Sequence, residues 1–162
     1  MSNIKKNTLA LIEMALKEAE VRQTENIYVE LTGGRDSFFT AWSLAYLGYK
    51  VTLNVVKYSS YPWQLLEKSV AHANAKYLAK TFDAVRYTIK DEDFMEMKSF
   101  DNNVFSSLYQ GKSANYGQSI SNIFSAYYHA RPDDVIAFGI KNEMSGSTYD
   151  ALNHKVLSLI HI

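Results

Sequence analysis

The strongest constraint on the fold is a strand, a glycine turn and a helix that follow one another without a gap. Apolar residues alternate with polar ones over Ile27–Leu31, which predicts a short, half-buried strand. Gly33 and Gly34 come next, and from Ser37 the apolar spacing is helical until Gly48, where a helix is expected to end. A strand that passes directly into a helix is typical of α/β folds.

The turn itself predicts an anion site. Glycine adopts positive φ and lacks a Cβ, so the backbone can fold tightly and approach a ligand closely. The N–H groups at the start of the helix favour an anion, and successive N–H groups form a concave nest that suits phosphate. The alternative is an ordinary tight turn in which Asp36 or Ser37 only caps the helix.

Two common nucleotide-binding loops are absent from the sequence. There is no Gly-x-x-x-x-Gly-Lys-Ser/Thr, which excludes the usual NTPase loop, and no Gly-x-Gly-x-x-Gly, so a dinucleotide fingerprint is not supported.

Periodicity along the rest of the chain predicts further strands at Val51–Val56, Ala84–Ile89 and Asp134–Phe138. Helices are expected over Thr8–Arg22, from Pro62 onward with Leu66, Val70, Ala73 and Tyr77 on one face, and over Ser119–His129. Strands separated by helices predict a Rossmann-like, mostly parallel sheet with helices on both faces. Ligands bind such sheets outside the carboxyl ends of the strands. We therefore expect the glycine turn and the segments after the second and fourth predicted strands to share one pocket.

Composition indicates a single domain over residues 1–162, with 47% apolar and 21% charged residues. The absence of cysteine excludes disulfides, thiolate metal sites and a catalytic thiol. No apolar run has the length of a membrane span and the first residues do not form a signal peptide, so we expect a cytoplasmic protein without a membrane partner. The chain has 17 basic and 17 acidic residues, and its basic residues do not cluster in the sequence. This favours a small-molecule substrate over nucleic acid.

The turn also resembles a known motif. Thr32-Gly33-Gly34-Arg35-Asp36-Ser37 is similar to the Ser-Gly-Gly-x-Asp-Ser signature of the PP-loop ATP pyrophosphatases, which have the adenine nucleotide alpha hydrolase-like fold. Within that superfamily, the segment that starts at Gly139 resembles the 7-cyano-7-deazaguanine synthases of queuosine biosynthesis. Glu143 and Asp150 are in register with that family's Glu and final Asp, and Tyr58 matches a tyrosine after its second strand.

The resemblance implies an ATP-dependent, ligase-type enzyme that uses Mg²⁺. A substrate carboxylate or amide would attack the α-phosphate of ATP, giving an adenylate and pyrophosphate. The backbone of Gly33 and Gly34 would hold the β- and γ-phosphates, while Asp36 and Ser37 would act as catalytic residues and Asp36 would also position the metal. The ATP site implied in this way comprises Thr32, Gly33, Gly34, Arg35, Asp36, Ser37, Lys57, Tyr58 and Gly139, and the substrate site comprises Lys141, Glu143 and Asp150.

The chain departs from that family at three places, one of which is Tyr116-Gly117, where the family has Arg-Asn before a helix. After its second strand the family reads Asp-Tyr-Gly-Gln-Arg-His, where this chain reads Lys57-Tyr58-Ser59-Ser60-Tyr61-Pro62. The family also carries a zinc site built from four cysteines, so we expect no zinc here. The competing interpretation is a non-catalytic nucleotide-binding or partner-binding domain derived from the same fold. A homodimer is expected only by analogy with small domains of this kind.

Overall fold

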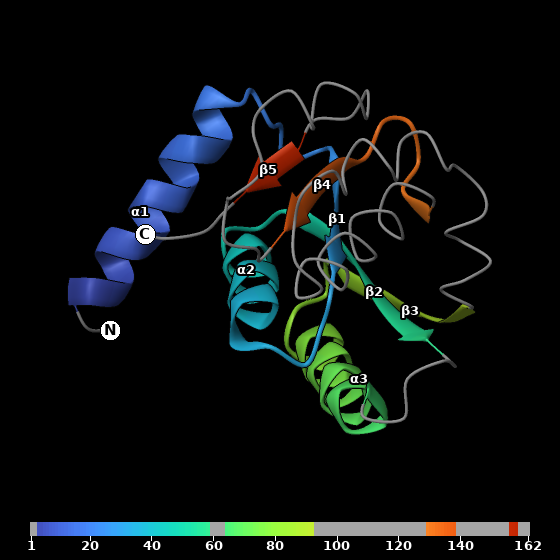
Figure 1. The fold of residues 1–162 in the computed structure, drawn as a ribbon. Helices are drawn as coiled ribbons and strands as arrows, with labels where there is room; N and C mark the ends of the chain where they lie inside the picture. Colours follow the sequence, from blue (N-terminus) through green and yellow to red (C-terminus); the bar gives the residue numbers. More distant parts are fainter. Residues whose placement is uncertain (1–2, 59–63, 93–128, 139–155, 159–162) are drawn as a thin grey trace, which may run out of the picture.

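The computed structural model describes residues 3–58, 64–92, 129–138 and 156–158, and within them five strands form one parallel sheet (Figure 1). The strands lie in the order β3-β2-β1-β4-β5, and every neighbouring pair is parallel. Their bounds are β1 Asn26–Glu30, β2 Lys50–Tyr58, β3 Val85–Glu92, β4 Val135–Phe138 and β5 Val156–Ser158. The predicted mostly parallel α/β sheet is confirmed.

β1 is the central strand, and the direction of winding reverses beside it. Ile27 pairs with Val51 of β2 on one side and with Val135 of β4 on the other. The chain runs outward from β1 through β2 to β3 and then continues on the far side with β4 and β5. In doubly wound sheets, the crevice at such a reversal is where ligands bind, outside the carboxyl ends of the strands. Here that point lies between the ends of β1 and β4.

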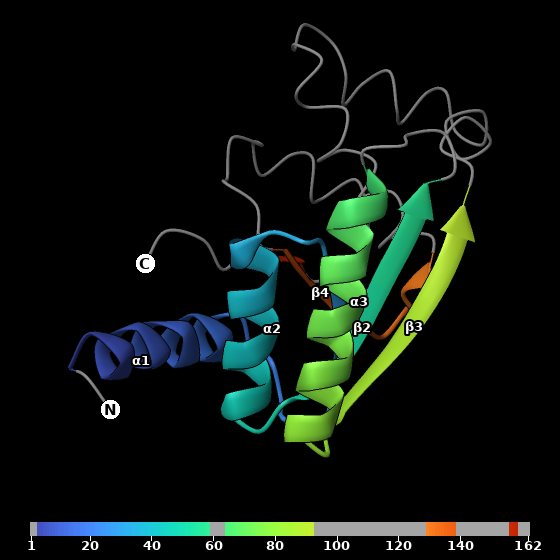
Figure 2. The ribbon, with the colours of Figure 1, turned by 90° about the horizontal axis from the view of Figure 1, so that it is seen from below.

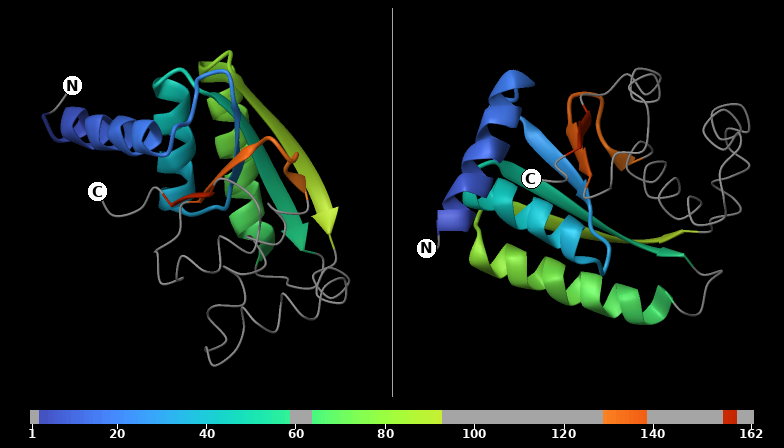
Figure 3. Two further views of the ribbon diagram at one scale, coloured as in Figure 1. Left: turned by 90° about the horizontal axis from the view of Figure 1, so that it is seen from above. Right: turned by 60° about the vertical axis from the view of Figure 1, so that its left-hand side comes forward.

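Helices α2 (Arg35–Tyr46) and α3 (Gln64–Thr81) lie side by side on the same face of the sheet (Figures 2 and 3). The apolar positions of β1 and β2, such as Val29 and Leu53, belong to the core that these helices cover. The helix expected over Ser119–His129 lies outside the described residues except at its end. No helix in the described part of the chain is long and apolar enough to cross a membrane.

Helix α1 (Asn3–Glu18) runs at a steep angle to α2 and α3 (Figure 2). Among its described side chains, Leu9, Ile12 and Leu16 are buried, at the three- and four-residue spacing of one helix face. The helix starts earlier than the predicted Thr8 and ends before the predicted Arg22.

The end of α1 is set by its backbone. Glu20 adopts φ 53°, its N–H donates to the Lys17 carbonyl, and the N–H of Val21 donates to the Leu16 carbonyl at 2.9 Å. This is a Schellman ending, and the chain beyond it cannot continue the helix. The same ending follows α2, where Gly48 has φ 86° and the N–H of Tyr49 donates to the Leu44 carbonyl. The predicted stop at Gly48 is therefore confirmed.

The buried face of α3 differs from the predicted one. Val70 and Tyr77 are 42% and 55% exposed, whereas Ala71, Ala75 and Leu78 are buried. Two faces of α3 carry apolar residues at helical spacing. The prediction was wrong because it assigned the face with the larger side chains to the core. The small alanines allow α3 to approach the sheet closely, which outweighs the greater hydrophobicity of the alternative face.

Candidate anion-binding site

The predicted loop lies at the carboxyl end of β1, beside the point where the winding reverses (Figure 1). The N–H of Leu31 still donates to the Asn54 carbonyl at 2.8 Å, so the ladder with β2 continues one residue beyond β1. The backbone then turns over Thr32, Gly33 and Gly34, and α2 begins at Arg35. The helix thus starts two residues earlier than predicted, which places Asp36 and Ser37 in its first turn.

The turn is closed by two hydroxyl groups. Ser37 Oγ lies 3.0 Å from Thr32 Oγ1 and accepts a hydrogen bond from the Thr32 N–H at 3.1 Å. It also lies 3.3 Å from the carbonyl oxygens of Thr32 and Gly34, to which it can donate. Ser37 is only 4% exposed. Its hydroxyl therefore shapes the turn from within, a role that the sequence did not indicate.

No side chain caps α2. The cap residue is Gly34, with φ −74° and ψ 156°, and no side-chain hydrogen bond caps the helix. The alternative in which Asp36 or Ser37 acts as the cap is therefore wrong. A helix start without a side-chain cap keeps N–H groups and the positive end of the helix dipole available to an anion.

Gly34 is needed for space and not for a special backbone conformation. Its φ is that of extended backbone, contrary to our argument from positive φ; among the described glycines, Gly48 is the residue with positive φ. A Cβ added at Gly34 would lie 3.2 Å from Thr32 Oγ1, which also accepts a hydrogen bond from the Gly34 N–H at 3.2 Å. A side chain at this position would therefore shift the Thr32 hydroxyl by a few tenths of an ångström.

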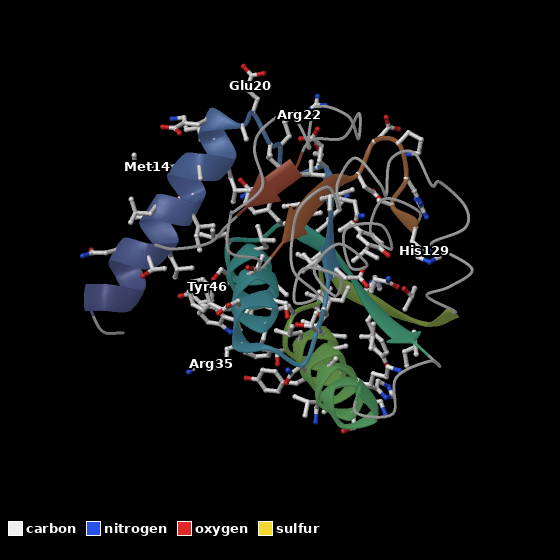
Figure 4. The ribbon with its side chains drawn as sticks, in the orientation of Figure 1. Met14, Glu20, Arg22, Arg35, Tyr46 and His129 are labelled. Atoms are coloured by element: carbon white, nitrogen blue, oxygen red, sulfur yellow. The ribbon has the colours of Figure 1, made fainter. Side chains whose placement is uncertain are left out.

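The two charged residues of the loop face solvent. Arg35 points outward from the start of α2, and Asp36 beside it is also exposed (Figure 4). Asp36 in the first turn interacts favourably with the helix dipole. In the part of the chain that the structure describes, no three His, Asp or Glu side chains come together as a metal site. In nucleotide sites Mg²⁺ takes one or two protein carboxylates beside phosphate oxygens and water, and such a role for Asp36 stays a prediction.

The other predicted site residues come from β2 and from beyond β4. Lys57 and Tyr58 are the last residues of β2, which extends four residues past the level of Glu30, about 13 Å along the sheet. Their backbone therefore stands at the same edge as the loop. β4 ends at Phe138. Gly139, Lys141, Glu143 and Asp150 lie outside the described residues.

Sequence reasoning missed a row of polar side chains behind the loop. Asn54 donates from Nδ2 to Glu30 Oε2 at 3.0 Å and accepts from the Thr88 hydroxyl at 3.1 Å. Glu30 and Asn54 are 4% and 0% exposed. The sequence signal for this row was Glu30, a carboxylate at the end of a strand that is central in the predicted sheet. A carboxylate that is buried in this way requires hydrogen-bond partners, which could have been sought on the neighbouring strand. We name Glu30, Asn54 and Thr88 the polar row.

Comparison with known proteins supports the fold alone. No known protein family matches the chain, and no curated protein does. Among solved structures, it is similar to a predicted subunit of a tRNA methyltransferase from Methanocaldococcus jannaschii. The two share 16% sequence identity with a TM-score of 0.55, and the match covers 83% of this chain and 68% of the other. The chain thus has an α/β, Rossmann-like fold that is found in another solved protein of very different sequence.

Proposed function

We propose that the loop from Thr32 to Ser37 binds the phosphates of ATP. The observation that carries this proposal is the placement of an uncapped helix start at the carboxyl end of the central strand, where the winding of the sheet reverses. The likeness of the six loop residues to the PP-loop signature supports the same ligand. A loop that served only as a turn would gain from a side-chain cap, and this one has none.

In this proposal the protein is a ligase-type enzyme that forms a substrate adenylate, from which a nucleophilic co-substrate then displaces AMP. An oxygen of a small-molecule carboxylate or amide attacks the α-phosphorus, the bond from that phosphorus to the bridging oxygen breaks, and pyrophosphate leaves with the electron pair. The backbone N–H groups at Gly33 and the start of α2 hold the departing phosphates in place. A Mg²⁺ ion held by Asp36 would neutralise charge on them.

Other residues complete the proposed site from neighbouring strands. Lys57 at the end of β2 offers a positive charge to the phosphates, and Tyr58 offers a ring to the base. Gly139 permits close approach of the nucleotide, while Lys141, Glu143 and Asp150 hold the substrate. The specificity of a 7-cyano-7-deazaguanine synthase is the finer form of this proposal, and it rests on the register of Glu143 and Asp150 and on the match of Tyr58.

The first experiment is calorimetric titration of Mg-ATP into the wild-type protein and into a variant with Asp36→Ala and Ser37→Ala. Saturable binding that the variant loses supports the loop as the phosphate site. Absence of heat from the wild type at millimolar ATP overturns it. Pyrophosphate release with candidate carboxylates then separates an enzyme, which turns over steadily, from a protein that binds ATP without turnover.

A second candidate function is that of a partner-binding domain, and the exposed surface of α2 supports it. Phe39 and Tyr46 are 42% and 49% exposed, and Trp42 between them stacks on Tyr46 with ring centroids 4.9 Å apart. Exposed aromatic side chains of this kind are enriched in protein interfaces. The similar solved protein is itself described as a predicted subunit. This candidate would be favoured if the wild-type protein binds a partner protein without turning over ATP and Tyr46→Ser abolishes that binding.

A further inference from the structure

We propose that Asn54 is a positioning residue that holds the end of β1, and with it the anion-binding loop, in place through the polar row. The inference rests on the proposed function for its ligand, although its structural part can be tested without one. Asn54 lies on β2, opposite Glu30 at the end of β1. It acts on the two residues that immediately precede the loop.

Asn54 holds these two residues with different groups. Its backbone carbonyl accepts from the N–H of Leu31 at 2.8 Å, and its side-chain Nδ2 donates to Glu30 Oε2 at 3.0 Å. The loop begins at the next residue, Thr32, whose N–H and hydroxyl both contact Ser37 Oγ. A displacement of the strand end therefore moves the first hydrogen-bonded residue of the loop.

The orientation of the Asn54 amide is itself fixed. The Glu30 carboxylate can only accept, so Nδ2 must face Glu30, and Oδ1 then accepts from the Thr88 hydroxyl at 3.1 Å. Asn54 is fully buried, and the amide has no room to turn away. Because Glu30 pairs with Asn54 and Asn54 with Thr88 in the sheet register, the row links β1, β2 and β3 at one level directly behind the loop.

The chain offers a control at the amino end of β1, the strand whose carboxyl end Asn54 contacts. Asn26 also donates from Nδ2 to a carboxylate, Asp134 Oδ1 at 2.9 Å, and accepts from the Thr52 hydroxyl at 2.9 Å. Asn26 stands at the amino end of β1, away from the loop. Asn54→Asp and Asn26→Asp each place a second carboxylate beside an existing one, so both substitutions lower the free energy of unfolding. Only Asn54→Asp disturbs the loop if the inference is right.

The test measures Mg-ATP affinity by calorimetry and the amide NMR signals of Gly33 and Gly34 without ligand. We expect Asn54→Asp to weaken binding about tenfold and to shift both signals, and Asn26→Asp to change affinity less than about twofold, because a lost charged hydrogen bond is worth roughly one decade in affinity. Unmoved signals in Asn54→Asp, or equal losses in both variants, overturn the inference. A wild-type protein that does not bind ATP overturns the proposed function and leaves the NMR result to decide this one.

A charge-swapped variant shows that the hydrogen bond is responsible. Glu30→Gln combined with Asn54→Asp restores one amide and one carboxylate in reversed order, and we expect affinity to return to within about threefold of wild type. Failure to recover would overturn the role of the pair. If Asn54→Asp does not fold, Thr88→Val removes only the hydroxyl that donates to Asn54 Oδ1. It should then weaken binding about threefold, and wild-type affinity would contradict the inference.

Discussion

The hydroxyl oxygens of Thr32 and Ser37 lie 3.0 Å apart and close the turn between β1 and α2 from the inside. Four further contacts of 3.1–3.3 Å connect these hydroxyls with the backbone of Thr32 and Gly34. The shape of the loop therefore depends on side chains of the loop itself, held against the end of β1.

Replacing Ser37 with Ala is expected to weaken Mg-ATP binding about tenfold and to lower the free energy of unfolding by about 1 kcal/mol, because the Thr32 N–H loses its acceptor. Calorimetry and urea unfolding measure the two effects. Ser43→Ala is the matched control, since Ser43 is buried on the same helix and its Oγ has no hydrogen-bond partner among the described residues. It should leave affinity unchanged and stability unchanged or higher.

Gly34→Ala is expected to reduce Mg-ATP affinity about fivefold while unfolding free energy stays within about 0.5 kcal/mol of wild type. The backbone angles at Gly34 suit any residue, so the effect comes from the 3.2 Å approach of the new Cβ to Thr32 Oγ1. Gly48→Ala should show the reverse pattern. It should lower the free energy of unfolding by about 1 kcal/mol because Gly48 has a positive φ, and it should leave Mg-ATP affinity unchanged. Equal affinity losses in both variants would contradict this prediction.

Glu20→Gly is expected to raise the free energy of unfolding by about 0.5–1 kcal/mol, because Glu20 occupies the left-handed position of the Schellman ending, where glycine has no Cβ penalty. Thermal and urea unfolding measure the gain. Glu20→Ala keeps the Cβ and should bring no such gain, so a similar increase in both variants would assign the effect to the lost charge.

Stability is expected to fall at alkaline pH through Tyr49. Burial, and next the Glu13 carboxylate, raise the pKa of the Tyr49 phenol above its ordinary value of 10.0. Above about pH 10 the unfolded chain therefore loses this proton while the folded chain keeps it, and the free energy of unfolding decreases as pH rises. Urea unfolding between about pH 8 and about pH 11 should show a steeper decline for wild type than for Tyr49→Phe. Parallel curves for the two proteins would contradict the assignment.

The central part of the fold was predictable because its signals are local. Alternation over Ile27–Leu31 and the stop at Gly48 each depend on a few neighbouring residues, and both agree with the structure. The start of α2 was placed too late because the prediction followed the apolar spacing from Ser37, whereas the helix already begins at the charged residues Arg35 and Asp36. Strand β5 was not predicted, since Val156–Ser158 is too short for alternation to show.

The missing elements depend on contacts that no local pattern encodes. Two faces of α3 have helical spacing, and only the distance to the sheet selects the alanines. The polar row joins residues 24 and 34 positions apart through register, so it becomes visible only when the strands are paired. The site residues from Gly139 onward lie outside the described chain, and their roles stay predictions.

The central position of β1 has a consequence for the order of synthesis. Asn26 and its partner Asp134 are 108 positions apart, while β1, β2 and β3 are all complete by Glu92. About 40 residues separate the end of β3 from the start of β4, which corresponds to roughly 2–8 s of translation. Until β4 is synthesised, the edge of β1 that β4 covers in the folded protein has no partner strand, and such an edge can pair with another strand. In the proposed site, the loop from Thr32 to Ser37 is therefore synthesised well before the residues from Gly139 onward.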